Sequence, residues 1–401
     1  MKVAVMGYGT VGSGVVEVLF ENQELIAKRT GEAVEVKYIL DLREFPGDRF
    51  EDKIVHDVNT IMDDPEVGVV CEVMGGVGAA YHFTKMALER GKSVCTSNKE
   101  LVAKHGPELL QLAAANNCSY LFEASVGGGI PIIRPLNNAL TAEKVEAITG
   151  ILNGTTNYIL TKMEKDGADF ADVLKEAQEK GYAERNPEAD VEGHDACRKI
   201  SILSSLMTGK TVNSEKVYTE GITKVSAADF VYAKKMGKSI KLLGQSRDLG
   251  DEVLVMVAPC MISDANPLYM VSDVFNAILV HGNMLGDSMY YGRGAGKLPT
   301  ASAVVADVID CVKNAGKNIV TLWDAEEAKV ADIAEVERSF FLRVEGTALE
   351  AVKNVFPGGE VIVVEGREDA AYVTAPVKEK DFAAKCEALG DVVLSKIRVG
   401  E

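Results

Sequence analysis

The first third of the chain alternates between short apolar runs and longer segments with helical spacing. Apolar runs typical of strands buried on both faces occupy residues 3–6, 34–40, 68–74, 93–96 and 119–123. Segments with apolar residues three or four apart lie between them, and one such helix is expected at 107–116. Alternating strands and helices predict a parallel, doubly wound sheet, which binds its ligand at the carboxyl ends of the strands.

The pattern becomes mixed after a glycine-rich segment, EASVGGGIPIIRPL, at 123–136. Strands and helices are then expected at 145–152, 157–165, 169–180, 226–236, 239–245 and 253–257. Thr155 or Thr156 is expected to cap the first of these helices, and a further helix is expected from about Thr300. Beyond a polar, alanine-rich linker, the tail reads strand, helix, strand, strand, helix, strand, which is the ferredoxin-like order.

The turn after the first strand carries GYGTVG and leads into an apolar helix. Glycines with this spacing between a strand and a helix are typical of a dinucleotide-binding turn, because they let the backbone approach a pyrophosphate. The residues expected to line this turn are Gly7, Gly9, Thr10, Val11 and Gly12. Gly75 and Lys99 follow two further strands, at the edge where a nicotinamide and a substrate would meet.

The second strand of the sheet ends at Asp41. An acidic residue in this place normally binds the ribose 2′-hydroxyl of the adenosine and favours NAD. Arg43, two residues on, is placed to meet the 2′-phosphate of NADP instead. The sequence therefore favours NAD and leaves NADP open.

These patterns together predict an α/β protein with three domains. They are a Rossmann dinucleotide-binding domain over 1–130, to which helix 300–316 returns, an α+β domain over 131–320, and a ferredoxin-like βαββαβ module over 336–401.

A charged pair stands out in the segment GYAERNPEADVEGHDACRKISILSSLMTG at 181–209. On a helix, Asp195 and Lys199 are one turn apart and fall on the apolar face. Such a pair is either a buried structural ion pair or a catalytic lysine held by a carboxylate at the floor of a pocket. His194 is expected to be a capping or surface residue, since it stands at the start of the helix.

The composition of the 401 residues narrows the class of partner. A net charge of −17 argues against nucleic acid or an anionic membrane, and no stretch resembles a membrane span or a signal peptide. The seven cysteines are scattered without metal-ligand spacing, which indicates reduced thiols and a cytoplasmic location.

Over residues 1–320 the sequence resembles the homoserine dehydrogenase family. The motifs that carry the resemblance are GYGTVG, TSNKE, FEASVGGGIPII, LNGTTNYIL, GYAERNPEADVEGHDACRK and GRGAGKLPTASAVVADVID. The resemblance implies NAD(P)-dependent interconversion of L-homoserine and L-aspartate 4-semialdehyde, a step toward threonine and methionine. The tail looks like a short, divergent ACT domain, a regulatory module, with VEGTALEAV in place of the usual D-x-P-G-V turn.

The same resemblance implies roles for individual residues. Lys199 corresponds to the acid/base and Lys99 to a second active-site lysine. Glu184 and Asp195 correspond to homoserine contacts, and Asp190 is ranked beside them on the substrate side. Gly181 and Gly296 correspond to backbone neighbours of the cofactor. A monovalent cation, sodium, is implied near Glu123, Val126, Gly128 and Ile130, and the family is usually dimeric or tetrameric.

Two alternatives belong to other classes of protein. One is a different semialdehyde or amino-acid dehydrogenase on the same architecture, but no cysteine lies in a convincing nucleophile motif. The other is a non-enzymatic NAD sensor whose tail is its effector module. A sensor would not need Asp195 and Lys199 on a core-facing stripe.

Overall fold

The computed structural model describes residues 1–400, and its first part is the predicted parallel sheet. The six strands are β1 (Lys2–Met6), β2 (Glu35–Leu40), β3 (Ile54–Val55), β4 (Val67–Glu72), β5 (Ser93–Thr96) and β6 (Tyr120–Leu121). They are parallel, in the order β3-β2-β1-β4-β5-β6. This is the strand order of a dinucleotide-binding Rossmann sheet, so the predicted fold of this part is confirmed.

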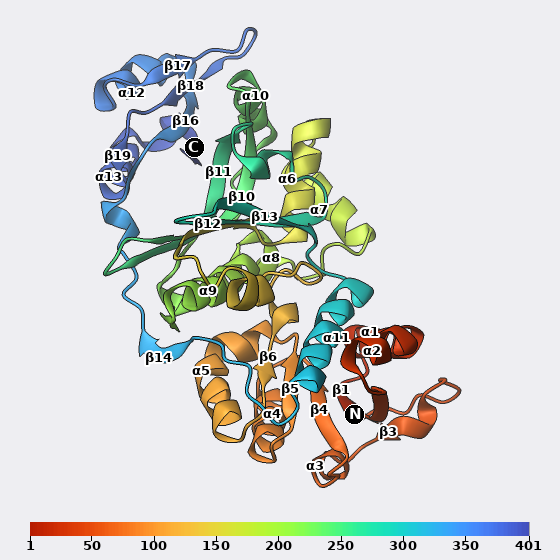
Figure 1. The fold of residues 1–401 in the computed structure, drawn as a ribbon. Coiled ribbons are helices and arrows are strands. Elements are labelled where there is room, and N and C mark those ends of the chain that lie inside the picture. The colour runs from red at the N-terminus through yellow and green to blue at the C-terminus, as the bar shows by residue number, and fades with distance from the viewer. Residues whose placement is uncertain (401) are drawn as a thin grey trace.

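Helices cover both faces of this sheet (Figure 1). They are α1 (Thr10–Glu21), α2 (Gln23–Thr30), α3 (Asn59–Met62), α4 (Gly78–Glu89), α5 (Lys99–Ala115) and α11 (Lys297–Lys313). Val3 and Val5 pack into one cluster with α1 and α11, whereas Ala4 and Met6 point to the opposite face, toward α4 and α5. The alternation along β1 thus places apolar side chains on both faces of the sheet.

Three predicted boundaries in this part were wrong. Helix α5 begins at Lys99 and not at 107, because the Asn98 side chain caps it and accepts a hydrogen bond from the Leu101 N–H at 3.1 Å. Pro107 lies inside the helix, although proline is most frequent in the first turn of a helix. Helix α11 begins three residues before Thr300, and β6 is shorter than the predicted strand, which leaves Glu123 in a 3₁₀ turn.

The middle of the chain forms an antiparallel sheet with helices packed on one face. Its main strands are β7 (Val145–Ile151), β10 (Lys238–Asp248), β11 (Val253–Ser263), β12 (Phe275–Gly282) and β13 (Gly286–Arg293), with the short β9 (Tyr218–Thr219) beside β11. The helices are α6 (Gly154–Asp166), α7 (Phe170–Glu179), α8 (Glu188–Val191), α9 (His194–Thr208) and α10 (Ala227–Lys235). Helices α6, α9 and α10 contact β10.

The tail continues the middle sheet through one strand. Its elements are β16 (Phe340–Glu345), α12 (Leu349–Val355), β17 (Glu360–Ile362), β18 (Asp369–Val373), α13 (Glu379–Leu389) and β20 (Val393–Val399). In the order β20-β16-β18-β17, the two strands of each βαβ unit have one strand of the other unit between them. This is the ferredoxin-like arrangement. Strand β20 pairs with β11 through Cys260↔Arg398 and Met261↔Val399.

Between α11 and the tail the chain runs back along the surface past α5 (Figure 1). There β14 (Asp324–Glu327) pairs with β8 (Lys210–Thr211), and Trp323 donates a hydrogen bond to the Thr211 hydroxyl at 3.1 Å. The short strands β15 (Glu337–Arg338) and β19 (Val377–Lys378) pair where the tail begins. No helix within residues 1–400 has the length and apolar character needed to cross a membrane.

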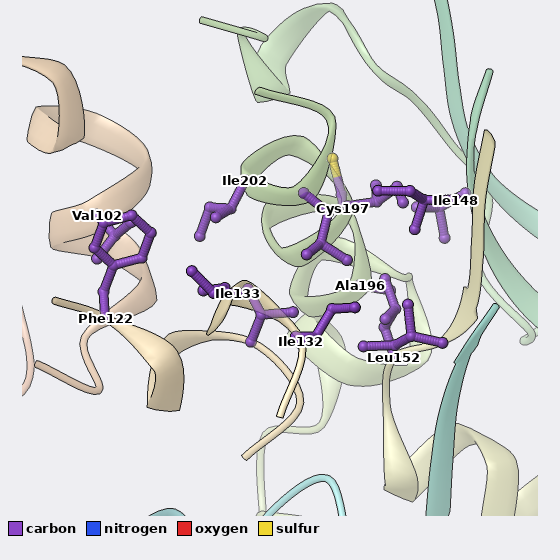
Figure 2. Packing of buried hydrophobic residues seen from close by; sticks show 14 of the residues in the cluster. Val102, Phe122, Ile132, Ile133, Ile148, Leu152, Ala196, Cys197 and Ile202 are labelled. Atoms are coloured by element: carbon purple, nitrogen blue, oxygen red, sulfur yellow. The ribbon is translucent and has the colours of Figure 1, made fainter. Parts of the chain in front are cut away.

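Helix α9 lies where the first two parts of the chain meet. Figure 2 shows Ile202 of α9 turned toward Val102 of α5 and Phe122, while Ala196 and Cys197 lie on the side of Ile148 and Leu152. The cluster is continuous through the helix, which is therefore buried on more than one face. Burying this apolar surface fixes α9, and the charged groups near its first turn, relative to both sheets.

Candidate active site

Two lysines meet on one buried carboxylate at the start of α9. Lys199 Nζ lies 2.7 Å from Asp195 Oδ2 and donates to the Leu152 carbonyl at 2.7 Å, and the residue is only 9% exposed. Lys99 Nζ lies 2.9 Å from Asp195 Oδ1 and remains partly exposed. Asp195 thus bridges a buried and a half-buried ammonium group, each brought in by a different part of the chain.

Asn153 connects this pair to a second carboxylate, a role that was not predicted from the sequence. Its Nδ2 donates to Asp195 Oδ2 at 2.9 Å and to Asp190 Oδ1 at 2.7 Å. Its Oδ1 accepts from the Thr156 N–H at 2.9 Å and so caps α6. The prediction that Thr155 or Thr156 caps this helix was wrong, because the asparagine before them takes the N-cap position.

The two carboxylates differ in their electrostatic surroundings. Burial alone would raise the pKa of Asp195, but the charges of Lys199 and Lys99 hold it well below its usual range. Burial raises the pKa of Asp190, whose carboxylate has the Asn153 amide as its one hydrogen-bond partner within residues 1–400. The site therefore contains one fixed negative charge and one carboxylate whose charge is disfavoured.

The two asparagines of the motif LNGTTNYIL, Asn153 and Asn157, hold elements of this site together. Asn157 lies on the first turns of α6, where its Nδ2 lies within hydrogen-bond distance of the carbonyls of Val271, Asp273 and Phe275. These three carbonyls lead into β12. Asn153 thus holds the carboxylates and Asn157 holds the entry to the neighbouring strand, so one short motif aligns α6, α9 and β12.

The glycine turn after β1 leaves room for a ligand at the sheet edge. A Cβ on Gly12 would lie 1.8 Å from the Gly7 carbonyl oxygen, so the turn requires glycine at this close approach. A Cβ on Gly9 would meet nothing within 4 Å, which marks open space beside the first N–H groups of α1. These features fit the pyrophosphate of a dinucleotide.

Asp41 lies beside the glycine turn, as predicted, but its carboxylate is already engaged. It accepts from the Tyr8 N–H at 2.8 Å and from the Arg43 side chain at 2.9 and 3.0 Å. The hydrogen bonds from Arg43 hold the pKa of Asp41 well below its usual range. The Arg43 side chain is 62% exposed and is held by this ion pair and by the Phe45 ring, whose centroid lies 5.1 Å from the guanidinium carbon.

Glu72, a buried acid at the end of β4, was not predicted from the sequence. Glu72 is fully buried at the end of β4 and accepts from the Thr96 hydroxyl at 2.7 Å and the Met74 N–H at 2.9 Å. Thr96 in turn accepts from the Asn98 N–H at 2.9 Å. Burial raises the pKa of Glu72. This network fixes the ends of β4 and β5 and with them the first residue of α5, Lys99.

Other predicted site residues lie apart from this group. Glu184 is exposed on the loop after α7, and among residues 1–400 no side-chain hydrogen bond or ion pair joins it to Asp195. Gly181 ends α7 with a positive φ of 73°, and Gly296 is the N-cap of α11 with a φ of 125°. Gly75, after β4, has a φ of 81°. His194 is exposed, as expected for a surface residue.

Glu123 of the implied cation site serves the loop that follows it. Its carboxylate accepts from the N–H groups of Ile132, Ile133 and Arg134 at 2.5–3.0 Å. Burial raises its pKa. A carboxylate has about four acceptor positions, so three are used here and about one remains for a cation. Within residues 1–400 no cluster of three metal-ligating side chains occurs, so a cation at this place would depend on backbone carbonyls.

Comparison with known proteins gives one consistent family. A homoserine dehydrogenase family model matches residues 131–309, and the model of that family's NAD-binding domain matches residues 7–123. The homoserine dehydrogenase of Synechocystis is 44% identical over 437 residues, covering 98% of this chain and 96% of the relative.

Two solved structures are similar over different lengths. A homoserine dehydrogenase from Thiobacillus denitrificans aligns with a TM-score of 0.91 and 34% identity, over 100% of this chain and 98% of its own. A hyperthermophilic archaeal homoserine dehydrogenase mutant in complex with NADPH aligns with a TM-score of 0.66 and 29% identity. That alignment covers 77% of this chain and 97% of the archaeal one.

Proposed function

The chain belongs to the homoserine dehydrogenase family, and from that premise we propose that the side chains around Asp195 form its active site. The family's reaction is the reversible, NAD(P)-dependent interconversion of L-homoserine and L-aspartate 4-semialdehyde, in amino-acid biosynthesis. The observation that carries the site assignment is the pair of lysines held on Asp195 between the dinucleotide-binding sheet and the middle sheet. Membership of the family favours this enzyme over a non-enzymatic sensor or another semialdehyde dehydrogenase.

A direct assay tests the activity. Homoserine with NAD⁺ or NADP⁺ should give an absorbance increase at 340 nm, and the reverse reaction should consume the reduced cofactor. No change with either cofactor, in protein shown to be folded, would contradict the function.

Lys199 is assigned the acid/base role and Lys99 a supporting charge. The nicotinamide, when bound, supplies or accepts the hydride. The Lys199 ammonium group donates a proton to the aldehyde oxygen as it becomes an alkoxide, and in the other direction the neutral Lys199 amine accepts the hydroxyl proton of homoserine. The Leu152 carbonyl and Asp195 orient Nζ for this transfer. Lys99, on the same carboxylate, adds a second positive charge near the developing alkoxide.

The acidic side chains suit the amino-acid end of the substrate. Asp195, Asp190 and Glu184 are assigned to the α-ammonium group, for which carboxylates are the natural partners. Asp190 and Asp195 are already joined through Asn153. Glu184 is exposed on the adjoining loop and would complete this set from outside.

The dinucleotide is assigned to the carboxyl edge of the parallel sheet. The residues that would hold it are Gly7, Gly9, Thr10, Val11, Gly12, Asp41, Gly75, Lys99, Gly181 and Gly296. The open space at Gly9 supports the pyrophosphate position, and Asp41 is assigned to the adenosine ribose, which favours NAD.

Asp41→Ala should raise the dissociation constant for NAD⁺ about tenfold and change that for NADP⁺ less than about threefold. The variant loses a charged acceptor that the ribose 2′-hydroxyl of NAD⁺ would use and that the 2′-phosphate of NADP⁺ would not. Arg43→Ala is the matched control, because it frees the Asp41 carboxylate and removes the cation that a 2′-phosphate would meet. It should weaken NADP⁺ more than NAD⁺. Fluorescence titration with both dinucleotides measures this, and equal losses for both in Asp41→Ala would disprove the ribose assignment.

Sodium is proposed as an occupant of the loop after Glu123. Backbone oxygens of Val126, Gly128 and Ile130 are the assigned ligands, with Glu123 sharing its remaining acceptor position. The three hydrogen bonds that Glu123 accepts already order this loop, so the loop does not need the cation to hold its conformation.

The domain division, the assembly and the location extend the same proposal. The assigned domains are 1–130, 131–320 and 336–401, and the assembly is a homodimer or homotetramer. Exposed apolar side chains near β13 support self-association, among them Met284, Leu285 and Tyr291. All seven cysteines are free thiols, which supports a cytoplasmic location.

The tail is proposed to be a regulatory, ACT-like module. Its contacts with the middle domain are ionic as well as apolar: Arg343 pairs with the buried Asp229 at 2.8 Å, and Arg398, which Glu379 of the tail also holds, pairs with Glu220. The archaeal relative aligns over 97% of its own length with 77% of this chain, so a family member can be shorter than this chain, as expected if the tail is an added module.

Ending the chain after residue 335 should preserve turnover of homoserine and lower Tm. The acid/base group lies wholly within the remaining residues, but Asp229 loses its arginine and β11 loses its neighbour β20. Initial rates and thermal unfolding measure the two effects. Full-length Arg343→Gln is the control, since it breaks the ion pair without removing the strand. A truncated chain that does not fold, beside a folded Arg343→Gln, would contradict a separate module.

A further inference from the structure

One buried amide near the active site has no hydrogen-bond partner at either end. Asn276, in β12, is 1% exposed, and neither its Nδ2 nor its Oδ1 has a partner within residues 1–400. Asn157, the other buried asparagine with an unpartnered atom, differs because its Nδ2 already holds three carbonyls. A buried amide left unpaired at both ends lowers stability, so its retention calls for a partner in another state of the protein.

Asn276 lies opposite the end of β7, beside the residue that binds Lys199. In the pairing of β12 with β7, Ala277 is opposite Ile151, so Asn276 comes next to Leu152. The Leu152 carbonyl is the one that accepts from Lys199. The Phe275 carbonyl just before Asn276 is held by Asn157. The backbone of Asn276 is therefore fixed from both sides.

The amide of Asn276 faces glycine backbone. A Cβ on Gly294 would lie 2.0 Å from Asn276 Nδ2, and one on Gly154 would lie 3.5 Å from Oδ1. Gly294 belongs to the segment GRGAG at 292–296, which joins β13 to α11. In that segment Gly294 is buried, whereas Ala295, Gly296 and the residues that follow are exposed. Gly292 and Arg293 still pair with β12, Gly292 directly opposite Asn276, and Gly294 is the buried residue that lies against the unpaired amide.

We propose that Asn276 is a positioning residue for the dinucleotide. Gly294 already lies against the amide; when the cofactor binds beside 294–296, a small adjustment of this segment lets the amide donate to one of its carbonyls and accept from one of its N–H groups. The α11 N-terminus and the cofactor are then fixed relative to β12 and, through Leu152, to Lys199. This inference rests on the proposed placement of the cofactor next to Gly296.

The test is Asn276→Leu, which keeps the size of the side chain and removes both polar atoms. The dissociation constant for NADP⁺, and for NAD⁺ in parallel, should rise about tenfold, as expected for two lost hydrogen bonds. Tm of the ligand-free protein should not fall, because the unpaired amide has been removed. An unchanged dissociation constant, or a Tm lowered by more than about 5 °C, would assign the amide no role or a purely structural one. A raised KM for homoserine alone would also overturn the inference.

Thr84→Val is the matched control. Thr84 is fully buried on α4, its hydroxyl has no partner within residues 1–400, and it is remote in sequence from the glycine segment. Its replacement should leave both dissociation constants unchanged, so a rise there would mean that loss of any buried polar atom weakens binding.

Hydrogen exchange of the unmodified protein separates this inference from the proposed function. NADP⁺ should slow exchange of the N–H groups in 7–12 and in 293–296. Slowing at 7–12 without any at 293–296 would overturn the role of Asn276 while the cofactor assignment stands. No slowing at 7–12 would contradict the cofactor assignment itself.

Discussion

Lys199→Ala should lower kcat for homoserine oxidation about a thousandfold and leave the dissociation constant of the dinucleotide nearly unchanged. The variant removes the only group assigned to move the hydroxyl proton, and acid/base catalysis by one positioned side chain contributes factors of this size. The glycine turn and Asp41, to which the pyrophosphate and ribose are assigned, follow β1 and β2 of the parallel sheet and share no hydrogen bond or ion pair with Lys199, so binding is preserved. Steady-state rates and fluorescence titration of the same preparation measure the two quantities.

Lys241→Met is the matched control for this variant. Lys241, on β10, is a second deeply buried lysine of the middle domain. It is 1% exposed and donates to the Val271 carbonyl at 2.7 Å, and within residues 1–400 no carboxylate forms an ion pair with it. Its loss should leave turnover within a few-fold of the unmodified protein. The Lys199→Ala protein should still fold, because Asp195 keeps Lys99 and Asn153 as partners. Retention of a tenth or more of the turnover would remove Lys199 as the acid/base.

The sequence anticipated the site where its signal was local. Asp195 and Lys199 are one helical turn apart on an apolar face, and that spacing predicted the pair that lies 2.7 Å apart in the structure. The glycine turn likewise lies within six residues and follows a strand. Both features depend only on neighbours in the chain, so periodicity and motif suffice to find them.

The contacts that complete the site come from distant segments and carried no such signal. Lys99 reaches Asp195 only because α5 and α9 pack together, and the predicted start of α5 was eight residues too late. Asn153 joins two carboxylates some forty residues further on, and nothing in its neighbourhood predicts this. Tertiary packing decides which of several polar residues meet, and it cannot be read from spacing alone.

Glu123 and the tail show the same difference between features set by local pattern and features set by packing. A carboxylate after a strand could serve a cation or the backbone, and only the loop path reveals that three N–H groups point at it. The order of elements in the tail predicted its ferredoxin-like arrangement, because that order follows from local pattern. The pairing of β20 with β11, which joins two sheets, depended on packing.

Asp195→Asn should lower the free energy of unfolding at pH 7 by about 3 kcal/mol and reduce turnover. The substitution keeps the shape but leaves two ammonium groups without their shared countercharge, and breaking a buried ion pair costs about this much. The pKa of Asp195 is depressed in the folded state, so its stabilisation is present above the unfolded pKa of about 4 and is lost as pH falls below it. Urea unfolding at pH 7 and pH 3 should show the difference narrowing in acid.

Asp190→Asn is the matched control, with the opposite sign expected. Burial raises the pKa of Asp190, so its charge is disfavoured in the folded state and its cost appears as pH rises through the unfolded pKa. Both carboxylates bond to the same Asn153 amide, and only the electrostatic environment separates them. Removing the Asp190 charge should leave stability at pH 7 unchanged or higher. Equal losses in the two variants would mean that Asn153 bonding, and not the two lysines, accounts for the stabilisation by Asp195.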